Sequence, residues 1–289
     1  LPVLALAALA RLFVLRYAMF LTGLALLFFI TGFGMWRILD GNPAHIPGYK
    51  AVSSAMRVEG NRILDEKPAP GGYYHILDNF TERRNIDLSQ QYGFPQVAQK
   101  PVARGLYRDG DRILGLYREG NRDRSYFAAG LDAFPYLLKP VGTFLLIGTD
   151  GGFKIHEIWD EKRTIRAVEP TRTIYELVRQ DIDGMGGITL SCNAPLGVLE
   201  PRAFDLIDMG SSFLAEGEAN RYAVTIEAIS RYFTALRDDG VLSLPVATAG
   251  FPVFAEKLLA TVDQSLHRNG VDDPGKHVLV YRSESGARI

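Results

Sequence analysis

The chain has 289 residues, which is enough for one large domain or two modest ones with a real core. Its 32 Lys and Arg residues balance 33 Asp and Glu residues, so the net charge gives no reason to expect a nucleic-acid partner. The single cysteine, Cys192, excludes a disulfide framework and a cysteine-based zinc site, and its apolar context predicts a buried, inert thiol. The five histidines show no metal-ligand spacing, so no metal site is expected.

The N-terminal region is strongly apolar. Residues 17–36 carry no charge, and the run is as long as a helix needs to cross a bilayer core. Tyr17 and Trp36 stand at its two ends, where interfacial aromatic residues belong, and an arginine flanks each of them. Residues 1–40 are therefore predicted to be a transmembrane segment in a lipid bilayer. A buried helix of a soluble protein and a signal peptide are the alternatives.

The next region is predicted to be a small β-rich domain, residues 41–128. The composition changes sharply near residue 40 to Gly, Pro, Asp and Arg, and residues 41–71 hold turn signals with short apolar pieces between them. Residues 73–80 read as a strand, and residues 105–120 as a hairpin with "RDGDR" as its turn.

From residue 129 to residue 289, strands alternate with helices, which predicts an α/β fold with a doubly wound parallel sheet. The predicted strands are 143–148, 164–170, 187–192, 204–209, 241–246 and 277–283. The predicted helices are 129–140, 153–161, 173–180, 225–240 and 254–270, the last two ending in glycine as helices often do.

The turn after the first of these strands reads Gly148-Thr149-Asp150-Gly151-Gly152. Glycines in that place let the backbone approach a ligand closely, although they also occur in ordinary turns. Glu169 ends the next strand, 21 residues after Gly148, where an acidic side chain can accept hydrogen bonds from ribose hydroxyls. The pattern is not the dinucleotide fingerprint, so it favours a nucleoside site of the S-adenosylmethionine type over NAD or FAD.

Several segments resemble the spermidine synthase (aminopropyltransferase) family, especially its bacterial membrane-fused group. They are "GYYHILDNF", "LLIGTDGGF", "RAVEP", "FDLIDMG" and "ANRYAVTIEAISRYFTALRDDGVLSLPV", and the resemblance covers roughly residues 50–285. The resemblance implies a small β domain before a Rossmann-like, methyltransferase-type domain over residues 129–289. It also implies an active site for S-adenosylmethionine or its decarboxylated form, with a polyamine-like substrate. By this resemblance Gly148, Asp150, Gly151 and Gly152 line the cofactor and Glu169 holds its ribose. The family contacts the adenine with an Asp-containing turn after the third strand; here the acid is absent, and Asn193 in that turn is still able to hydrogen-bond the adenine.

The chain departs from that family at the end of the fourth strand, where the family places its catalytic acid. Attack by an amine needs such a base, because the amine is protonated at neutral pH. Asp208 stands one or two positions too early, and a one-residue offset on a strand turns the side chain to the other face. Asp208 remains a candidate for a substitute base in spite of this offset, and a structural or turn-capping acid is the alternative. Glu216 and Glu218 follow in a loop that is predicted to be solvated and is able to attract a cationic amine, and His156 is predicted to be a packed helix residue.

Three functional hypotheses follow. The first is a membrane-anchored transferase that binds an S-adenosylmethionine-type cofactor and acts on an amine. The second is a catalytically degenerate member of the fold that serves as a structural or assembly subunit of a membrane complex, with other membrane subunits or copies of itself as partners. The third is a methyltransferase. The resemblance implies the inner (cytoplasmic) membrane of a bacterium.

The ends of the chain and the side of the membrane form a last set of expectations. Residues 1–10 read as the end of a further apolar span, which makes residues 11–16 a short loop. The arginines of that loop place residues 41–289 outside by the positive-inside rule, whereas the cofactor implies the cytoplasm, so the side stays open. The resemblance implies a further strand after "VYRSESGARI", so a truncated C-terminus is also expected.

Overall fold

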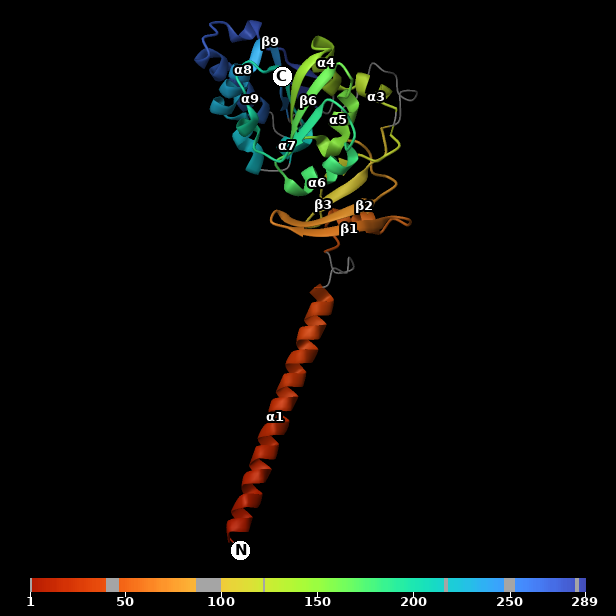
Figure 1. The fold of residues 1–289 in the computed structure, drawn as a ribbon, viewed down its shortest axis with the longest axis vertical. Coiled ribbons are helices and arrows are strands. Elements are labelled where there is room, and N and C mark those ends of the chain that lie inside the picture. The colour runs from red at the N-terminus through yellow and green to blue at the C-terminus, as the bar shows by residue number, and fades with distance from the viewer. Residues whose placement is uncertain are drawn as a thin grey trace. The chain divides into compact units, whose positions relative to one another are not determined.

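The computed structural model describes residues 2–39, 47–86, 100–121, 123–215, 218–246, 253–283 and 286–289. The chain divides into two compact units, Leu1–Met56 and Arg57–Ile289 (Figure 1). The part of the β-rich region from Arg57 onward and the parallel sheet therefore belong to one unit.

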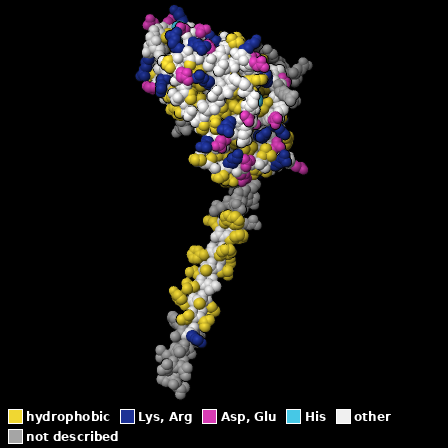
Figure 2. Space-filling model, in the orientation of Figure 1, with side chains coloured by type: hydrophobic (Ala, Val, Ile, Leu, Met, Phe, Trp, Pro, Cys, Tyr) yellow, Lys and Arg dark blue, Asp and Glu magenta, His cyan; other side chains and the backbone are white. Residues whose placement is uncertain are grey.

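The first unit contains the long helix α1 (Pro2–Leu39) and the short helix α2 (Ala51–Met56). Within α1, Val14–Trp36 is long and apolar enough to cross a membrane, with a mean hydropathy of 2.0, and none of it is buried inside the structure. Figure 2 shows hydrophobic side chains along this helix. The hydroxyls of Thr22 and Thr31 each donate to the carbonyl oxygen four residues earlier, so neither needs water as a partner.

The loop predicted at residues 11–16 is wrong, because α1 runs through it without a break. The stretch RLFVLR contains no glycine, no proline and no capping residue, and most of its residues are good helix formers. A break between two apolar segments needs such a signal, and its absence lets one helix continue.

The second unit begins with a four-stranded antiparallel sheet in the order β1-β2-β3-β4. The strands are β1 (Arg62–Ala69), β2 (Gly72–Asp78), β3 (Arg104–Arg108) and β4 (Asp111–Leu116). The predicted hairpin is confirmed, and Asp109 and Gly110 at its turn both have positive φ, as a tight two-residue hairpin turn requires. Strand β1 was not predicted. Its sequence RILDEKPA carries four charged residues and a proline, which only an edge strand tolerates, and β1 is the edge.

The short helices α3 (Ser125–Ala128) and α4 (Phe134–Leu138) lead into a five-stranded parallel sheet, which confirms the predicted fold class. Its order is β7-β6-β5-β8-β9. Successive strands are added on one side of β5 up to β7 and on its other side from β8 onward, so the strand order reverses between β5 and β8. The strands are β5 (Gly142–Ile147), β6 (Arg163–Val168), β7 (Ile188–Ser191), β8 (Phe204–Met209) and β9 (Leu236–Ser243). The helices between and after them are α5 (Phe153–Ile158), α6 (Arg172–Asp181), α7 (Ser211–Ala215), α8 (Ile226–Ala235) and α9 (Val253–Arg268).

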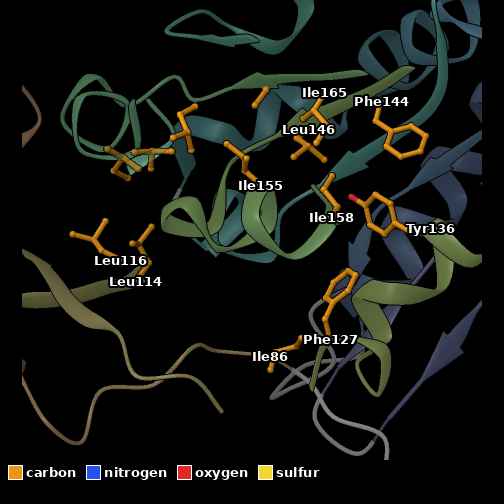
Figure 3. Packing of buried hydrophobic residues seen from close by; sticks show 14 of the residues in the cluster. Ile86, Leu114, Leu116, Phe127, Tyr136, Phe144, Leu146, Ile155, Ile158 and Ile165 are labelled. Atoms are coloured by element: carbon orange, nitrogen blue, oxygen red, sulfur yellow. The ribbon is translucent and has the colours of Figure 1, made fainter. Parts of the chain in front are cut away.

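Each face of the parallel sheet has its own hydrophobic core. On one face Phe144, Leu146 and Leu206 pack with α4, α5, α6 and the β domain (Figure 3). On the other face Leu145 and Ile207 pack with α8 and α9. Burial on both faces explains why these strands read as continuous apolar runs, and each such side chain contributes about 1.5–3 kcal/mol relative to exposure.

Two predicted elements near the C-terminus are different. The predicted helix 225–240 ends at Ala235, and β9 begins at the next residue. Gly240 therefore lies within a strand, where the pairing with β8 is irregular. The predicted strand 277–283 is a strand only at β11 (Tyr281–Arg282). With β10 (Pro245–Val246) and β12 (Ala287–Arg288) it forms a second small sheet in the order β10-β12-β11.

The turn after β5 gives a test of this packing. A Cβ atom at Gly151 would lie 2.3 Å from the Gly115 carbonyl oxygen of β4, whereas one at Gly184 meets nothing within 4 Å. Both glycines have positive φ, so Gly151→Ala and Gly184→Ala share the backbone penalty. We expect Gly151→Ala to lower the unfolding free energy by about 1–3 kcal/mol more than Gly184→Ala, measured by urea unfolding. Equal losses would show that β4 does not pack on this turn.

Candidate functional site

The glycine turn joins β5 to α5 and contains a run of left-handed residues. Gly148, Asp150, Gly151 and Gly152 all have positive φ, and Asp150 is among the few non-glycine residues of the described chain that do. Every residue from Phe144 to Ile155 is buried. The turn therefore lies inside the second unit and not at its surface.

Protein atoms occupy the space next to these glycines. A Cβ atom at Gly148 would lie 2.6 Å from Cβ of Phe213, which is itself only 1% exposed. On the other side the Tyr117 amide donates a hydrogen bond of 2.8 Å to the Gly151 carbonyl oxygen. The glycines thus allow α7 and the end of β4 to approach the turn, which is a packing reason for a sequence pattern that was read as a ligand signal.

The Asp150 carboxylate faces the β domain. Its Oδ2 accepts a hydrogen bond of 3.1 Å from Nη2 of Arg84, and its Oδ1 accepts from the backbone N–H and the hydroxyl of Ser212. Burial by itself would raise the pKa of Asp150, but the positive charges of Arg84 and Lys154 outweigh that effect and lower the pKa below its usual value. Asp150 is therefore held as a carboxylate by its partners.

Asp208 lies on the face of the sheet that packs against α5. It is completely buried, 2.7 Å from Nζ of Lys154, and it also accepts hydrogen bonds from the hydroxyl of Tyr136 and the guanidinium of Arg288. Burial and the negative charge of Asp208 raise the pKa of Tyr136 well above its usual value, so this phenol stays a donor. These contacts favour the structural acid, the alternative to a base that the sequence left open.

Two further acids, Asp132 and Glu157, share the cations that hold Asp150 and Asp208. Asp132 lies within ion-pair distance of Arg84, Lys154 and Arg288. Glu157 receives two hydrogen bonds from Arg84, of 2.9 and 3.2 Å, and one from the hydroxyl of Tyr126.

We name this cluster the buried ion-pair network. Its three cations are Arg84, Lys154 and Arg288, and its four acids are Asp132, Asp150, Glu157 and Asp208, all buried. Four negative and three positive charges leave an excess of one negative charge, which two tyrosine hydroxyls help to stabilise. The network connects the β domain, the stretch before α4, α5, β8 and β12.

Glu169 lies at the end of β6 beside the glycine turn, as predicted from its spacing. One carboxylate oxygen accepts from the amide and hydroxyl of Thr149, at 3.3 and 3.1 Å, and the other accepts from the amide of Thr171. Its carboxylate is 2% exposed and already helps to fix the turn.

Asn193 and Cys192 follow β7 and are both exposed. The predicted burial of Cys192 is wrong, because β7 is the outer strand of the sheet and the chain leaves it at Ser191. The carboxyl ends of β5, β6 and β7 lie at one edge of the sheet, so Asn193 shares that edge with the turn and Glu169. Glu216 lies outside the described residues, and the side chain of Glu218 is not described.

The structure adds residues that the sequence did not single out. Arg84, Lys154 and Arg288 hold the acids, and Phe213 lies over Gly148. Only Lys154 carried a usable signal, because it is a charge between the apolar residues Phe153 and Ile155. Among the described residues, no group of three or more His, Cys, Asp or Glu side chains is arranged to hold a metal ion.

Comparisons with known proteins identify the fold. No family model and no curated protein matches the chain. A probable spermidine synthase from Corynebacterium glutamicum has a TM-score of 0.50 and 10% identity over 71% of each chain. The spermidine synthase from Thermotoga maritima has a TM-score of 0.47 and 16% identity, covering 78% of this chain and 71% of that one. A SAM-dependent methyltransferase from Aquifex aeolicus has a TM-score of 0.37 and 13% identity, covering 51% of this chain and 79% of that one. The match to the Corynebacterium glutamicum structure shows that the chain shares the α/β fold of that probable spermidine synthase.

The buried ion-pair network predicts that replacing Lys154 lowers the unfolding free energy much more than replacing Lys139 does. Lys154→Met leaves Asp132 and Asp208 buried with one cation fewer, so we expect the unfolding free energy to fall by about 3–5 kcal/mol. Lys139→Met is the control, because the Lys139 partner Asp239 is 80% exposed and such pairs contribute about 0–1 kcal/mol. Chemical unfolding of both variants measures the difference. Similar losses would mean that the buried pairs do not stabilise the fold.

His156 predicts a pH dependence of stability. It stacks on Tyr117 with ring centroids 3.6 Å apart, and burial, with a smaller effect from Arg124, lowers its pKa to about 4. The folded state therefore binds this proton less readily than the unfolded state, whose pKa is about 6.5. Its contribution is complete above pH 6.5 and is lost as the pH falls towards 4.

We expect His156→Phe, which keeps an aromatic ring beside Tyr117, to reduce the fall in unfolding free energy between pH 6.5 and 5. His267→Phe is the matched control, because His267 is exposed on α9, and it is expected to leave the pH profile unchanged. Guanidinium unfolding at several pH values measures both. An unaltered profile for His156→Phe would contradict the assignment.

Proposed function

We propose that this chain is a membrane-anchored, non-catalytic member of the spermidine synthase and methyltransferase fold that serves as a structural or assembly subunit of a membrane complex. The observation that carries the proposal is the buried ion-pair network. Its cations pair with Asp150, Glu157 and Asp208, and these pairs tie the β domain to the parallel sheet.

The chemistry of amine transfer supports this proposal. An amine nucleophile must lose a proton before it attacks, and a carboxylate that accepts that proton has to contact the amine. Among the described acids near the turn, Asp150, Glu157 and Asp208 are buried and held by Arg84, Lys154 and Arg288. A carboxylate that is buried and paired in this way stabilises the fold.

The proposed location is a bacterial inner membrane. The support is the apolar segment Val14–Trp36 of α1. None of it is buried inside the structure, and it is long and apolar enough to lie in the hydrocarbon core of a bilayer. Other membrane subunits or further copies of this chain are the proposed partners.

A second candidate function is transfer from an adenosyl-type cofactor, either S-adenosylmethionine or its decarboxylated form, to a polyamine-like amine. The observation that favours it is the position of Glu169 beside the glycine turn, with the exposed Asn193 at the same sheet edge. Gly148, Asp150, Gly151 and Gly152 would then face the cofactor and Glu169 would hold its ribose.

One experiment separates the two candidates. The full chain in detergent micelles is incubated with decarboxylated S-adenosylmethionine and putrescine, or with S-adenosylmethionine and putrescine, and products are quantified by mass spectrometry. Binding of both cofactors is measured by calorimetry on the same sample. We expect no transfer product above the protein-free background.

The controls decide how each result is read. A known spermidine synthase shows that the assay detects product, and circular dichroism shows that the chain is folded. Product formation that disappears in Glu169→Gln overturns the non-catalytic proposal and supports the transferase. Micromolar binding without product, lost in Glu169→Gln, leaves the chain non-catalytic but with a retained nucleoside site.

A further inference from the structure

The carboxyl ends of β5 and β8 are neighbours at the place where the strand order of the parallel sheet reverses, and there Ile147 pairs with Met209. In open α/β sheets, ligands bind in a crevice at this place. We name it the switch point, defined by Gly148 at the end of β5 and Gly210 at the end of β8. Residues 147–152, Gly210 and Glu169 are all buried. The chain therefore covers its own switch point.

The side chain that covers Gly148 is Phe213 of α7. A Cβ atom at Gly148 would lie 2.6 Å from Cβ, 3.3 Å from Cγ and 3.4 Å from Cδ2 of Phe213, so the ring itself lies against the turn. Phe213 is 1% exposed and belongs to the same hydrophobic core as Ile147 and Met209. A ligand that approaches Gly148 from the side where a side chain would stand meets this ring first.

Hydrogen bonds on both sides of Phe213 hold α7 in this place. The Asp150 carboxylate accepts from the backbone N–H of Ser212, at 3.1 Å, and from the Ser212 hydroxyl. The side-chain amide of Asn220 donates a hydrogen bond of 2.7 Å to the carbonyl oxygen of Phe213, and Asn220 is itself buried. Moving the ring away together with α7 would leave these buried groups without their partners, which is unfavourable.

We propose that Phe213 is an internal plug, a side chain that occupies the switch point and excludes an adenosyl-type ligand from the glycine turn. The inference rests on the proposed function, because a chain that transfers a group from a bound cofactor needs an open switch point. It gives the proposed loss of activity a steric cause, which is separate from the pairing of the buried acids.

The test removes the plug and measures binding. The full chain in detergent micelles and its Phe213→Ala variant are titrated with S-adenosylmethionine in a calorimeter. We expect Phe213→Ala to bind S-adenosylmethionine at least about tenfold more tightly than the unchanged chain does. We also expect Glu169→Gln, added to Phe213→Ala, to remove this gain, because Glu169 is the acid beside the glycine turn.

Phe204→Ala is the matched control. Phe204 is a fully buried phenylalanine of the same hydrophobic core, but it lies at the other end of β8. Its removal is expected to leave the affinity for S-adenosylmethionine unchanged. Circular dichroism shows whether each variant is folded. Phe213→Val, which removes the ring but keeps more of the core filled, replaces Phe213→Ala if the alanine variant does not fold.

Equal affinity of the unchanged chain and the Phe213 variant, including no binding by either, overturns the plug. An equal gain in Phe204→Ala overturns it too, because general loosening of the core then explains the binding. A gain that persists with Glu169→Gln places the ligand elsewhere and has the same consequence. All three results leave the proposed function standing, whereas transfer product from the unchanged chain would overturn the proposed function and the plug together.

Discussion

The second unit depends on the pairing of charges that have no access to water. Moving one ion out of water costs several kcal/mol, and attraction to a well-placed partner is what offsets that cost. Lys154 and Asp208 are both fully buried and lie 2.7 Å apart, and Arg84 and Arg288 extend the same cluster from the β domain and from β12. Shifting any one of these elements would leave a buried charge without its partner, so the network determines how they fit together.

The alternation of side chains between the two faces of β8 determines which groups Asp208 contacts. Leu206 and Asp208 lie on the face that packs against α5, and Ile207 and Met209 lie on the opposite face. The sequence shows how far Asp208 stands from the strand end. It does not show that Lys154 of α5 lies on the same face of the sheet. An acid at nearly the same place in a chain has a different role when its side chain turns to a buried cation instead of towards an open edge.

The strands of the parallel sheet were predictable because burial on both faces leaves continuous apolar runs such as FLLI in β5. The hairpin turn at Asp109 and Gly110 was also predictable. Both residues of this two-residue turn have positive φ, and Asp-Gly is one of the few sequences that favour such a turn. The network was not predictable, because its partners come from positions as far apart as Arg84 and Arg288. Strand β1 was missed because an edge strand lacks the apolar pattern that marks buried ones.

The glycine turn shows why a sequence motif and a ligand site are separate claims. Gly151 needs a bare backbone because the Gly115 carbonyl of β4 approaches it, and Gly148 needs one because Phe213 does. Both requirements come from packing within the chain and would preserve the glycines without any cofactor. The same residues would also be required by a nucleoside at that edge, so the pattern alone cannot distinguish the two causes. In this structure the turn is in contact with α6, α7, β4, Arg84 and Glu169, and these contacts give the glycines a packing role that holds with or without a cofactor.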